Sequence, residues 1–238
     1  MSPTITLGDA LTLRDLQVYL SRAARIEEGS VRLIAGSGIL AVYVAVIYPV
    51  GLLDEVPTVL GLRTFAIAET EDMDSVVPIR SLLERVNRLA EAALPDESPD
   101  QPPDQSPARP IVMTLPMAVN TVTWAAISPP KGGWTPHSVT TSGLLDRIAR
   151  AGIAEVAAVI PAGTGQQIVQ RVRAEVWGRP IDEIEDVPAG GAFAALSLGF
   201  LGDIASDEVR VFESGPWTRL TTPRGHVLIK RKAWRLAR

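Results

Sequence analysis

The feature that most constrains the fold is a proline- and aspartate-rich segment, Pro95–Pro110, which reads PDESPDQPPDQSPARP. Six of its sixteen residues are proline and four are acidic. Proline fixes φ and lacks a backbone donor, and like charges repel, so this segment cannot form a helix or a central strand. We therefore predict an exposed linker at 95–110 between two domains, residues 1–94 and 111–238.

The pattern of the first domain predicts α-β-β-β-α. A helix is expected from Thr12 to Gly29, because leucines and alanines recur there at helical spacing. Three β-branched runs follow, and glycines at 36 and 38 supply a turn between the first two, so a hairpin is expected rather than a phosphate loop. A second amphipathic helix opens at Pro78. These expected elements form a three-stranded antiparallel meander flanked by helices; the strands are 31–35, 39–48 and 62–68.

The second domain reads as a helix-rich α+β unit that ends in a basic β-hairpin, so the predicted fold class of the whole chain is α+β. A helix should start at Ser142 and stop at Gly152, and residues 154–160 fit helix or strand, with helix favoured. Further helices are expected at 167–177 and 191–201. The expected strands are 111–115, 119–127, 209–212, 217–222 and 226–232, with a loop at 129–133.

Composition narrows the possible chemistry. The absence of cysteine excludes disulfides, thiolate metal sites and a cysteine nucleophile. The two histidines, His137 and His226, are too few for a histidine-rich metal site, and no G-x-S-x-G motif is present. We therefore predict no catalytic residues, no metal and no cofactor.

Three local patterns have alternative functional interpretations that we rank below structural ones. Ala162–Gly165 precedes a helix, as in a phosphate-binding turn, but it lacks the P-loop lysine and needs a preceding strand. The acidic cluster 182–186 can bind a hard cation, yet its spacing matches no motif, and a solvated loop is favoured. His137 is expected in a loop, and His226 at the start of a strand.

The basic end of the chain carries the main binding hypothesis. The whole chain has a net charge of −4, whereas the last 22 residues contain seven basic residues and no acidic one. Tryptophans interleave with these cations, as in nucleic-acid-binding surfaces, but a basic strand edge that prevents aggregation is the favoured alternative. Helix 191–201 has no basic residue, which argues against winged-helix readout. The predicted anion-binding residues are Arg219, Arg224, Lys230, Arg231 and Lys232.

Helix 191–201 is almost wholly apolar, which fits a domain core or an interface between two copies. No signal peptide is visible, and the longest apolar run, 39–50, is too short to cross a bilayer. We therefore expect a cytoplasmic protein without a membrane partner.

Several strings, at 151–156, 173–180, 191–201 and 217–228, resemble a family of uncharacterised proteins from high-GC actinobacteria. The resemblance covers most of the second domain. It implies no activity, cofactor or site, but it does imply that the two parts occur together and that 154–160 is helical.

The favoured function is therefore that of a non-catalytic binding or assembly protein that self-associates. One alternative is binding of a polyanion or nucleic acid by the basic hairpin, with affinity falling steeply as salt rises. Another is an enzyme or small-ligand protein that uses a cleft between the two parts.

Overall fold

The computed structural model describes residues 3–27, 29–49, 56–68, 72–93, 109–119, 122–160 and 165–231. The chain is α+β, as predicted, and it divides into two compact units. Unit 1 comprises Met1–Tyr43 and Arg63–Val122, and unit 2 comprises Val44–Leu62 and Thr123–Arg238. The predicted linker falls in unit 1, and all but its last two residues lie outside the described ranges.

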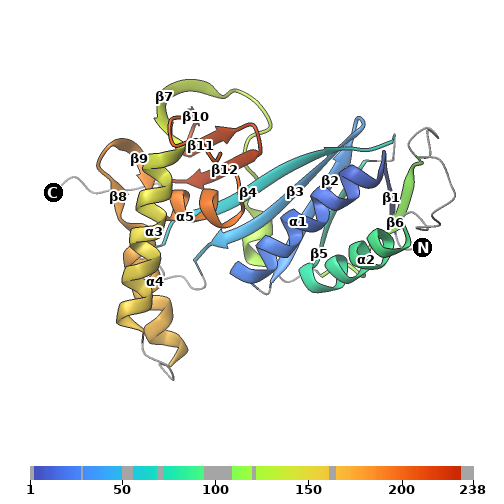
Figure 1. Cartoon of the computed structure of the whole chain (residues 1–238), viewed down its shortest axis with the longest axis horizontal. Coiled ribbons are helices and arrows are strands. Elements are labelled where there is room, and N and C mark those ends of the chain that lie inside the picture. Colours follow the sequence, from blue (N-terminus) through green and yellow to red (C-terminus); the bar gives the residue numbers. More distant parts are fainter. Residues whose placement is uncertain are drawn as a thin grey trace, which may run out of the picture. The chain divides into compact units, whose positions relative to one another are not determined.

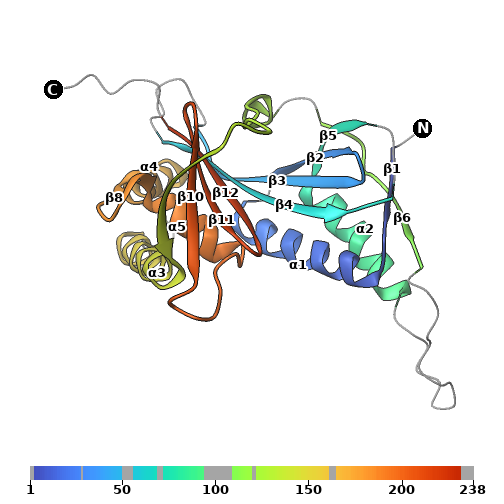
Figure 2. The same ribbon diagram turned by 90° about the horizontal axis from the view of Figure 1, so that it is seen from above.

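Unit 1 consists of two helices and antiparallel strands. Its hydrogen-bonded strand order is β5-β2-β3-β4, and β1 pairs separately with β6. The helices α1 and α2 pack against each other and lie on one face of these strands (Figure 1, Figure 2). The elements are β1 (Thr4–Leu7), α1 (Ala10–Ile26), β2 (Ser30–Gly36), β5 (Met73–Pro78), α2 (Ile79–Ala92) and β6 (Ile111–Thr114), with parts of β3 (Ile39–Ile47) and β4 (Thr58–Ala66).

The start of α1 is set by a side-chain cap. The Asp9 carboxylate accepts a hydrogen bond of 2.7 Å from the Thr12 backbone N–H, which satisfies one of the free donors of the first turn. The buried side of the helix carries Leu13, Leu16 and Leu20. Tyr19 is also buried there, and its hydroxyl donates to the Val42 carbonyl oxygen at 3.3 Å.

The predicted three-stranded meander is incomplete. A fourth strand, β5, pairs with β2, and Arg32 donates two hydrogen bonds across this pair to Asp74, at 2.8 and 2.6 Å. The charge of Asp74 in β5 is thus neutralised by an arginine 42 positions earlier, a partner that local sequence does not reveal. The structure also adds β1 before α1, paired with β6, so Ile111–Thr114 is grouped with unit 1.

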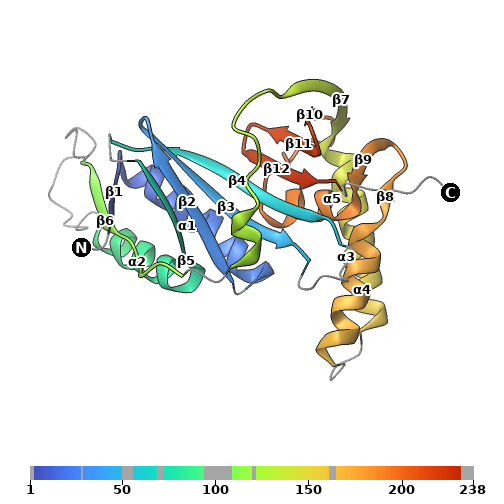
Figure 3. The ribbon, with the colours of Figure 1, turned by 180° about the vertical axis from the view of Figure 1, so that it is seen from behind.

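Unit 2 has strand order β3-β4-β12-β11-β10-β7, and its assigned strand pairs are antiparallel (Figure 3). A small hairpin, β8–β9, leads into α5. The elements are the 3-10 helix η1 (Thr123–Ala126), β7 (Thr135–Thr141), α3 (Ser142–Val159), α4 (Gln166–Gly178), β8 (Pro180–Ile181), β9 (Ile184–Pro188), α5 (Ala189–Ser197), β10 (Glu208–Ser214), β11 (Trp217–Thr222) and β12 (Gly225–Lys230).

The strand register divides the unit 2 sheet into two faces. The helix-covered face lies against α5: a Cβ added to Gly191 would lie 2.8 Å from Ile229 Cδ1 and 3.6 Å from Leu220 Cδ1. Because side chains alternate along each strand, Val211 and Thr218 share this face. The other positions form what we call the opposite face; they include Arg210, Phe212, Trp217, Arg219, His226, Leu228 and Lys230.

Two predictions in unit 2 are corrected. The strand expected at 119–127 is wrong, since Thr123–Ala126 is a 3-10 helix. The helix stop expected at Gly152 is also wrong, because α3 continues to Val159. Gly152 is there for packing: the Trp177 ring of α4 occupies the space that a Cβ would need. The same continuity shows that 154–159 is helical, as favoured.

A further correction concerns β7. His137 is expected in a loop, but it lies within β7, which pairs with β10 over Thr135–Thr141, at the point where the register shifts. The strand is mostly exposed and polar, so it lacks the apolar alternation by which buried strands are recognised. Among the helices of the described ranges, none is long and apolar enough to cross a membrane.

Candidate functional site

The five predicted anion-binding residues do not form one cluster in unit 2. Arg219 lies on β11 and belongs to the opposite face, as does Lys230 at the end of β12. Arg224 lies in the turn between these strands, Arg231 follows β12, and Lys232 lies outside the described residues. Each described arginine therefore has its own surroundings.

Arg224 is engaged within the protein. Its guanidinium donates to the Leu201 carbonyl oxygen at 2.9 Å and to Asp203 at 3.2 Å. Its backbone N–H donates to the Thr222 hydroxyl at 3.2 Å. These bonds give Arg224 a structural role, joining the β11–β12 turn to the segment after α5.

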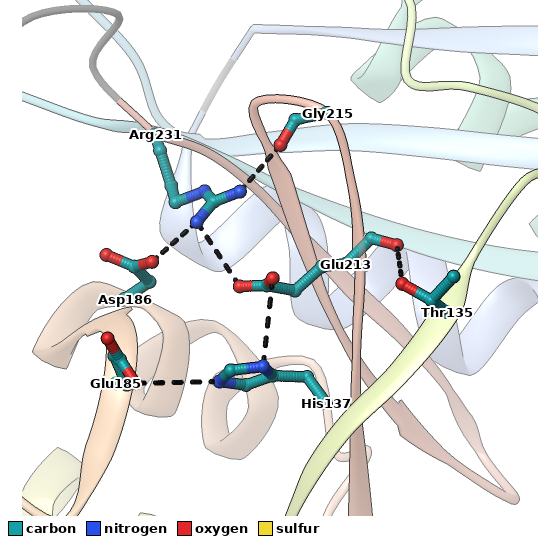
Figure 4. A network of polar contacts seen from close by, with 7 residues as sticks. All are labelled: Thr135, His137, Glu185, Asp186, Glu213, Gly215 and Arg231. Carbon is teal, nitrogen blue, oxygen red and sulfur yellow. Dashed lines mark hydrogen bonds and ion pairs between the residues drawn. The ribbon is translucent and has the colours of Figure 1, made fainter.

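Arg231 is the centre of a polar network (Figure 4). One terminal nitrogen donates to Asp186 at 2.5 Å and to Glu213 at 3.2 Å, and the other donates to the Gly215 carbonyl oxygen at 2.6 Å. The Arg231 side chain is 27% exposed, so these bonds are partly shielded from water. The network joins β9, β10, the β10–β11 turn and the residue after β12.

His137 lies at the edge of this network. Its Nδ1 is 3.7 Å from Glu213 and its Nε2 is 3.9 Å from Glu185, both too long for hydrogen bonds. The two contacts become ion pairs only when the imidazole is protonated. The fold thus brings together three features that are separate in the sequence: a basic residue, the acidic cluster 182–186 and a histidine.

The backbone at Asp186 supports its role as a partner. Asp186 has φ of 59°, in the left-handed region that few residues other than glycine adopt. This turn places its carboxylate on Arg231. Glu213 was missed by sequence reasoning, since a single glutamate at the end of a strand carries no signal. Within the described ranges, no group of three or more histidine, aspartate and glutamate residues is arranged to hold a metal ion.

Arg219 has a different environment. Its Cζ lies 4.5 Å from the Trp134 ring centroid and 4.7 Å from that of Phe212. Its Nε is buried without a hydrogen-bond partner, and no described residue forms a hydrogen bond or an ion pair with its guanidinium. Burial lowers the pKa of Arg219 below its usual value. Phe212 is its direct cross-strand partner, which the hairpin register would have revealed.

His226 lies diagonally across from Arg219 on β12. Its Nδ1 is 3.2 Å from the Thr221 hydroxyl. Burial, and secondarily the nearby Arg219 charge, lowers the pKa of His226 below its ordinary value. The neutral imidazole is therefore favoured in the folded protein, and Arg219 remains the main charge at this position.

The three described arginines differ in whether their terminal nitrogens are bonded within the protein. Arg224 and Arg231 have their terminal nitrogens bonded to protein oxygens, whereas Arg219 is stacked between rings. The phosphate-loop interpretation of Ala162–Gly165 also loses its context: residues 161–164 lie outside the described ranges, and the preceding element is the helix α3.

The fold of this chain resembles that of solved DNA polymerase sliding clamps. The sliding clamp (DNA polymerase III subunit beta) from Bartonella birtlesii, bound to griselimycin, matches with a TM-score of 0.52 and 11% identity over 98% of this chain. DNA polymerase III subunit beta from Borrelia burgdorferi, in complex with a natural product, matches with a TM-score of 0.51 and 7% identity over 96% of this chain. This chain spans 66% and 64% of those two proteins.

A search of curated proteins finds no match. Two domain families do match, and each covers less than half of the chain. Residues 1–106 match the domain of unknown function DUF8010, and residues 129–234 match the domain of unknown function DUF8185. The resemblance to uncharacterised proteins is thereby confirmed, while the actinobacterial source stays a prediction.

Proposed function

We propose that this chain is a non-catalytic binding and assembly protein that self-associates. The observation that carries the proposal is the fold: 98% of the chain superposes on a protein named as a sliding clamp and polymerase subunit. That protein is named as a subunit of a larger enzyme, so the assembly role is proposed for this chain by analogy of fold alone. The bonding of Arg224 and Arg231 to oxygens of the same unit agrees with it, since these side chains support the structure of the unit.

The edge strand β7 is the proposed contact between copies. It is the last strand in the order of unit 2, and no described strand pairs with its outer side. Unpaired edge strands are templates for pairing with another chain. Pro136 lacks a backbone donor and the ladder with β10 is irregular near Phe212, so the regular part of β7 is Ser138–Thr141.

Val139 makes this contact testable. It is an apolar residue on β7 with 59% exposure, and Val112 on β6 in unit 1 has the same exposure. In an antiparallel pair of two β7 strands, lysine at 139 would place like charges close together. We expect Val139→Lys to weaken self-association at least about tenfold, whereas Val112→Lys leaves it unchanged.

Sedimentation equilibrium of the full chain measures both variants at micromolar concentration. A wild-type chain that stays monomeric throughout this range would refute self-association. Equal weakening by the two lysine substitutions would refute β7 as the contact, because only one of them lies on that edge.

A further inference from the structure

The arginine stack of the opposite face, formed by Trp134, Phe212 and Arg219, has the features of a prepared binding group. The guanidinium lies between two aromatic rings, at 4.5 and 4.7 Å from their centroids. Rings that stack on a guanidinium cover its faces and leave hydrogen bonding to its edge. Because its Nε is buried, the donors of Arg219 that remain for a ligand are its two terminal nitrogens.

Both rings are positioned by the backbone around them. Phe212 is held by strand pairing, directly opposite Arg219. The Trp134 indole N–H donates to the Pro130 carbonyl oxygen at 3.2 Å, and the next residue, Thr135, donates its hydroxyl to the Glu213 carbonyl oxygen at 3.2 Å. The stack is thus part of the built structure of unit 2.

The donors of Arg219 lack a counterpart among the described residues. The Nε atoms of Arg219 and Arg231 are both buried and unbonded, but the terminal nitrogens of Arg231 contact two carboxylates and a carbonyl oxygen, whereas Arg219 has no hydrogen bond or ion pair to a described residue. Buried polar groups in folded proteins nearly always have a partner. The two terminal nitrogens of a guanidinium match the two oxygens of a carboxylate or phosphate.

The neighbouring charges on the opposite face favour an anion. The cations Arg210 and Lys230 occupy the same face by register. The acidic residue that the register places there is Glu208, which lies 3.9 Å from Arg210 at the far end of β10. A basic face on a chain of net charge −4 attracts a short anionic group more readily than a long polyanion.

We infer that Arg219, held between Trp134 and Phe212, binds a side-chain carboxylate of an acidic segment of a partner protein. An acidic peptide fits better than nucleic acid, because the two rings of the stack already contact the arginine instead of a base. The inference deepens the proposed function and rests on it, since it names a partner for the binding role.

The test measures peptide binding to the full chain at low salt. Binding is monitored through the arginine Nε–Hε signals in ¹⁵N NMR spectra. The probe is an acetylated, amidated hexaglutamate, and a single-stranded hexathymidylate is the comparison. We expect hexaglutamate to shift the Arg219 signal. Arg219→Gln should weaken peptide binding about tenfold or more, since bonds between charged groups are lost.

Arg150→Gln is the matched control, because Arg150 is an exposed arginine on α3 whose partner is Asp146 in the preceding turn. It should bind the peptide as the wild type does. Arg219→Lys keeps the charge but loses the planar edge, so it should also bind weakly, and it covers the case in which Arg219→Gln does not fold.

Hexaglutamate binding that is unaffected by Arg219→Gln, or an absence of binding, would overturn the inference. Binding of hexathymidylate through Arg219 at equal or higher affinity would also overturn it, in favour of nucleic acid. The outcome is separable from that of the proposed function. A chain that assembles but ignores the peptide contradicts this inference alone, and a monomer that binds it contradicts self-association alone.

Discussion

The two faces of the unit 2 sheet are stabilised in different ways. On the helix-covered face, Gly191 of α5 lies directly over Ile229, and the contact has no space for a further side chain. On the opposite face, a cation lies between two rings without an ion pair among the described residues. The first arrangement depends on close packing and the second on a charge that a ligand can reach. We therefore expect stability to be concentrated on one face and binding on the other.

The largest effect is expected from overpacking the helix-covered face. A Cβ at position 191 would lie 2.8 Å from Ile229 Cδ1 and 3.2 Å from Val187 Cγ1, so Gly191→Val should lower the free energy of unfolding by about 2–3 kcal/mol. Urea denaturation measures the loss. Gly132→Ala is the control, since no atom lies within 4 Å of its added Cβ. Equal stability of the two variants would show that α5 is free to move away from the sheet.

The next effect concerns the network around Arg231. Arg231→Met leaves Asp186 and Glu213 without their cation and Gly215 without a donor. The expected loss of stability is about 2 kcal/mol, because partly buried carboxylates lose charged hydrogen bonds. The measurement is the urea midpoint at neutral pH and moderate salt. An unchanged midpoint would mean that water replaces the arginine without cost.

The same substitution at position 219 sharpens the comparison. Arg219→Met keeps an unbranched side chain between Trp134 and Phe212 and, unlike Arg231→Met, breaks no hydrogen bond or ion pair to a described residue. Sulfur–aromatic contacts partly replace the cation–π contacts, so the change in unfolding free energy should stay within about 1 kcal/mol. A loss as large as that of Arg231→Met would mean that Arg219 is a structural residue, and the contrast between the two arginines would fail.

The smallest effect is a pH dependence on the opposite face. Because the pKa of His226 is lowered in the folded state, the unfolded chain binds this proton first as pH falls. Protonation of His226 therefore has no effect on the free energy of unfolding well above the ordinary histidine pKa. As the pH falls through that value, the free energy of unfolding decreases. His226→Gln should reduce the slope of stability between pH 7.5 and 5. A steeper slope in the variant would reverse the assigned direction of the shift.

Much of the fold was predictable from local pattern. The strands β10 to β12 and the helix α4 match the predicted segments closely, because apolar spacing and turn residues mark them. Strand β7 was not predictable, since an exposed edge strand is under no requirement to alternate apolar and polar residues. The helix end predicted at Gly152 was wrong for a related reason. Glycine is needed there because of the Trp177 ring, which is distant in the sequence.

The candidate site was less predictable than the fold. The sequence identified Arg219 and Arg231 as equivalent cations, but their environments differ through residues brought together by folding. Asp186 lies 45 positions before Arg231, and Trp134 lies far before Arg219. Strand pairing and loop placement decide that Arg231 is neutralised and that Arg219 has no ion pair among the described residues. Neither composition nor residue spacing predicts this difference.

The division of β3 and β4 between the units has a consequence for the order of folding during synthesis. Residues 44–62 belong to unit 2, and His226 of β12 pairs with Leu62 of β4, roughly 165 residues earlier in the chain. At translation rates of about 5–20 residues per second, β4 leaves the ribosome on the order of ten seconds or more before its partner exists. Chaperone contact with the nascent chain is therefore expected at residues 58–62, until the last strand emerges and completes the sheet.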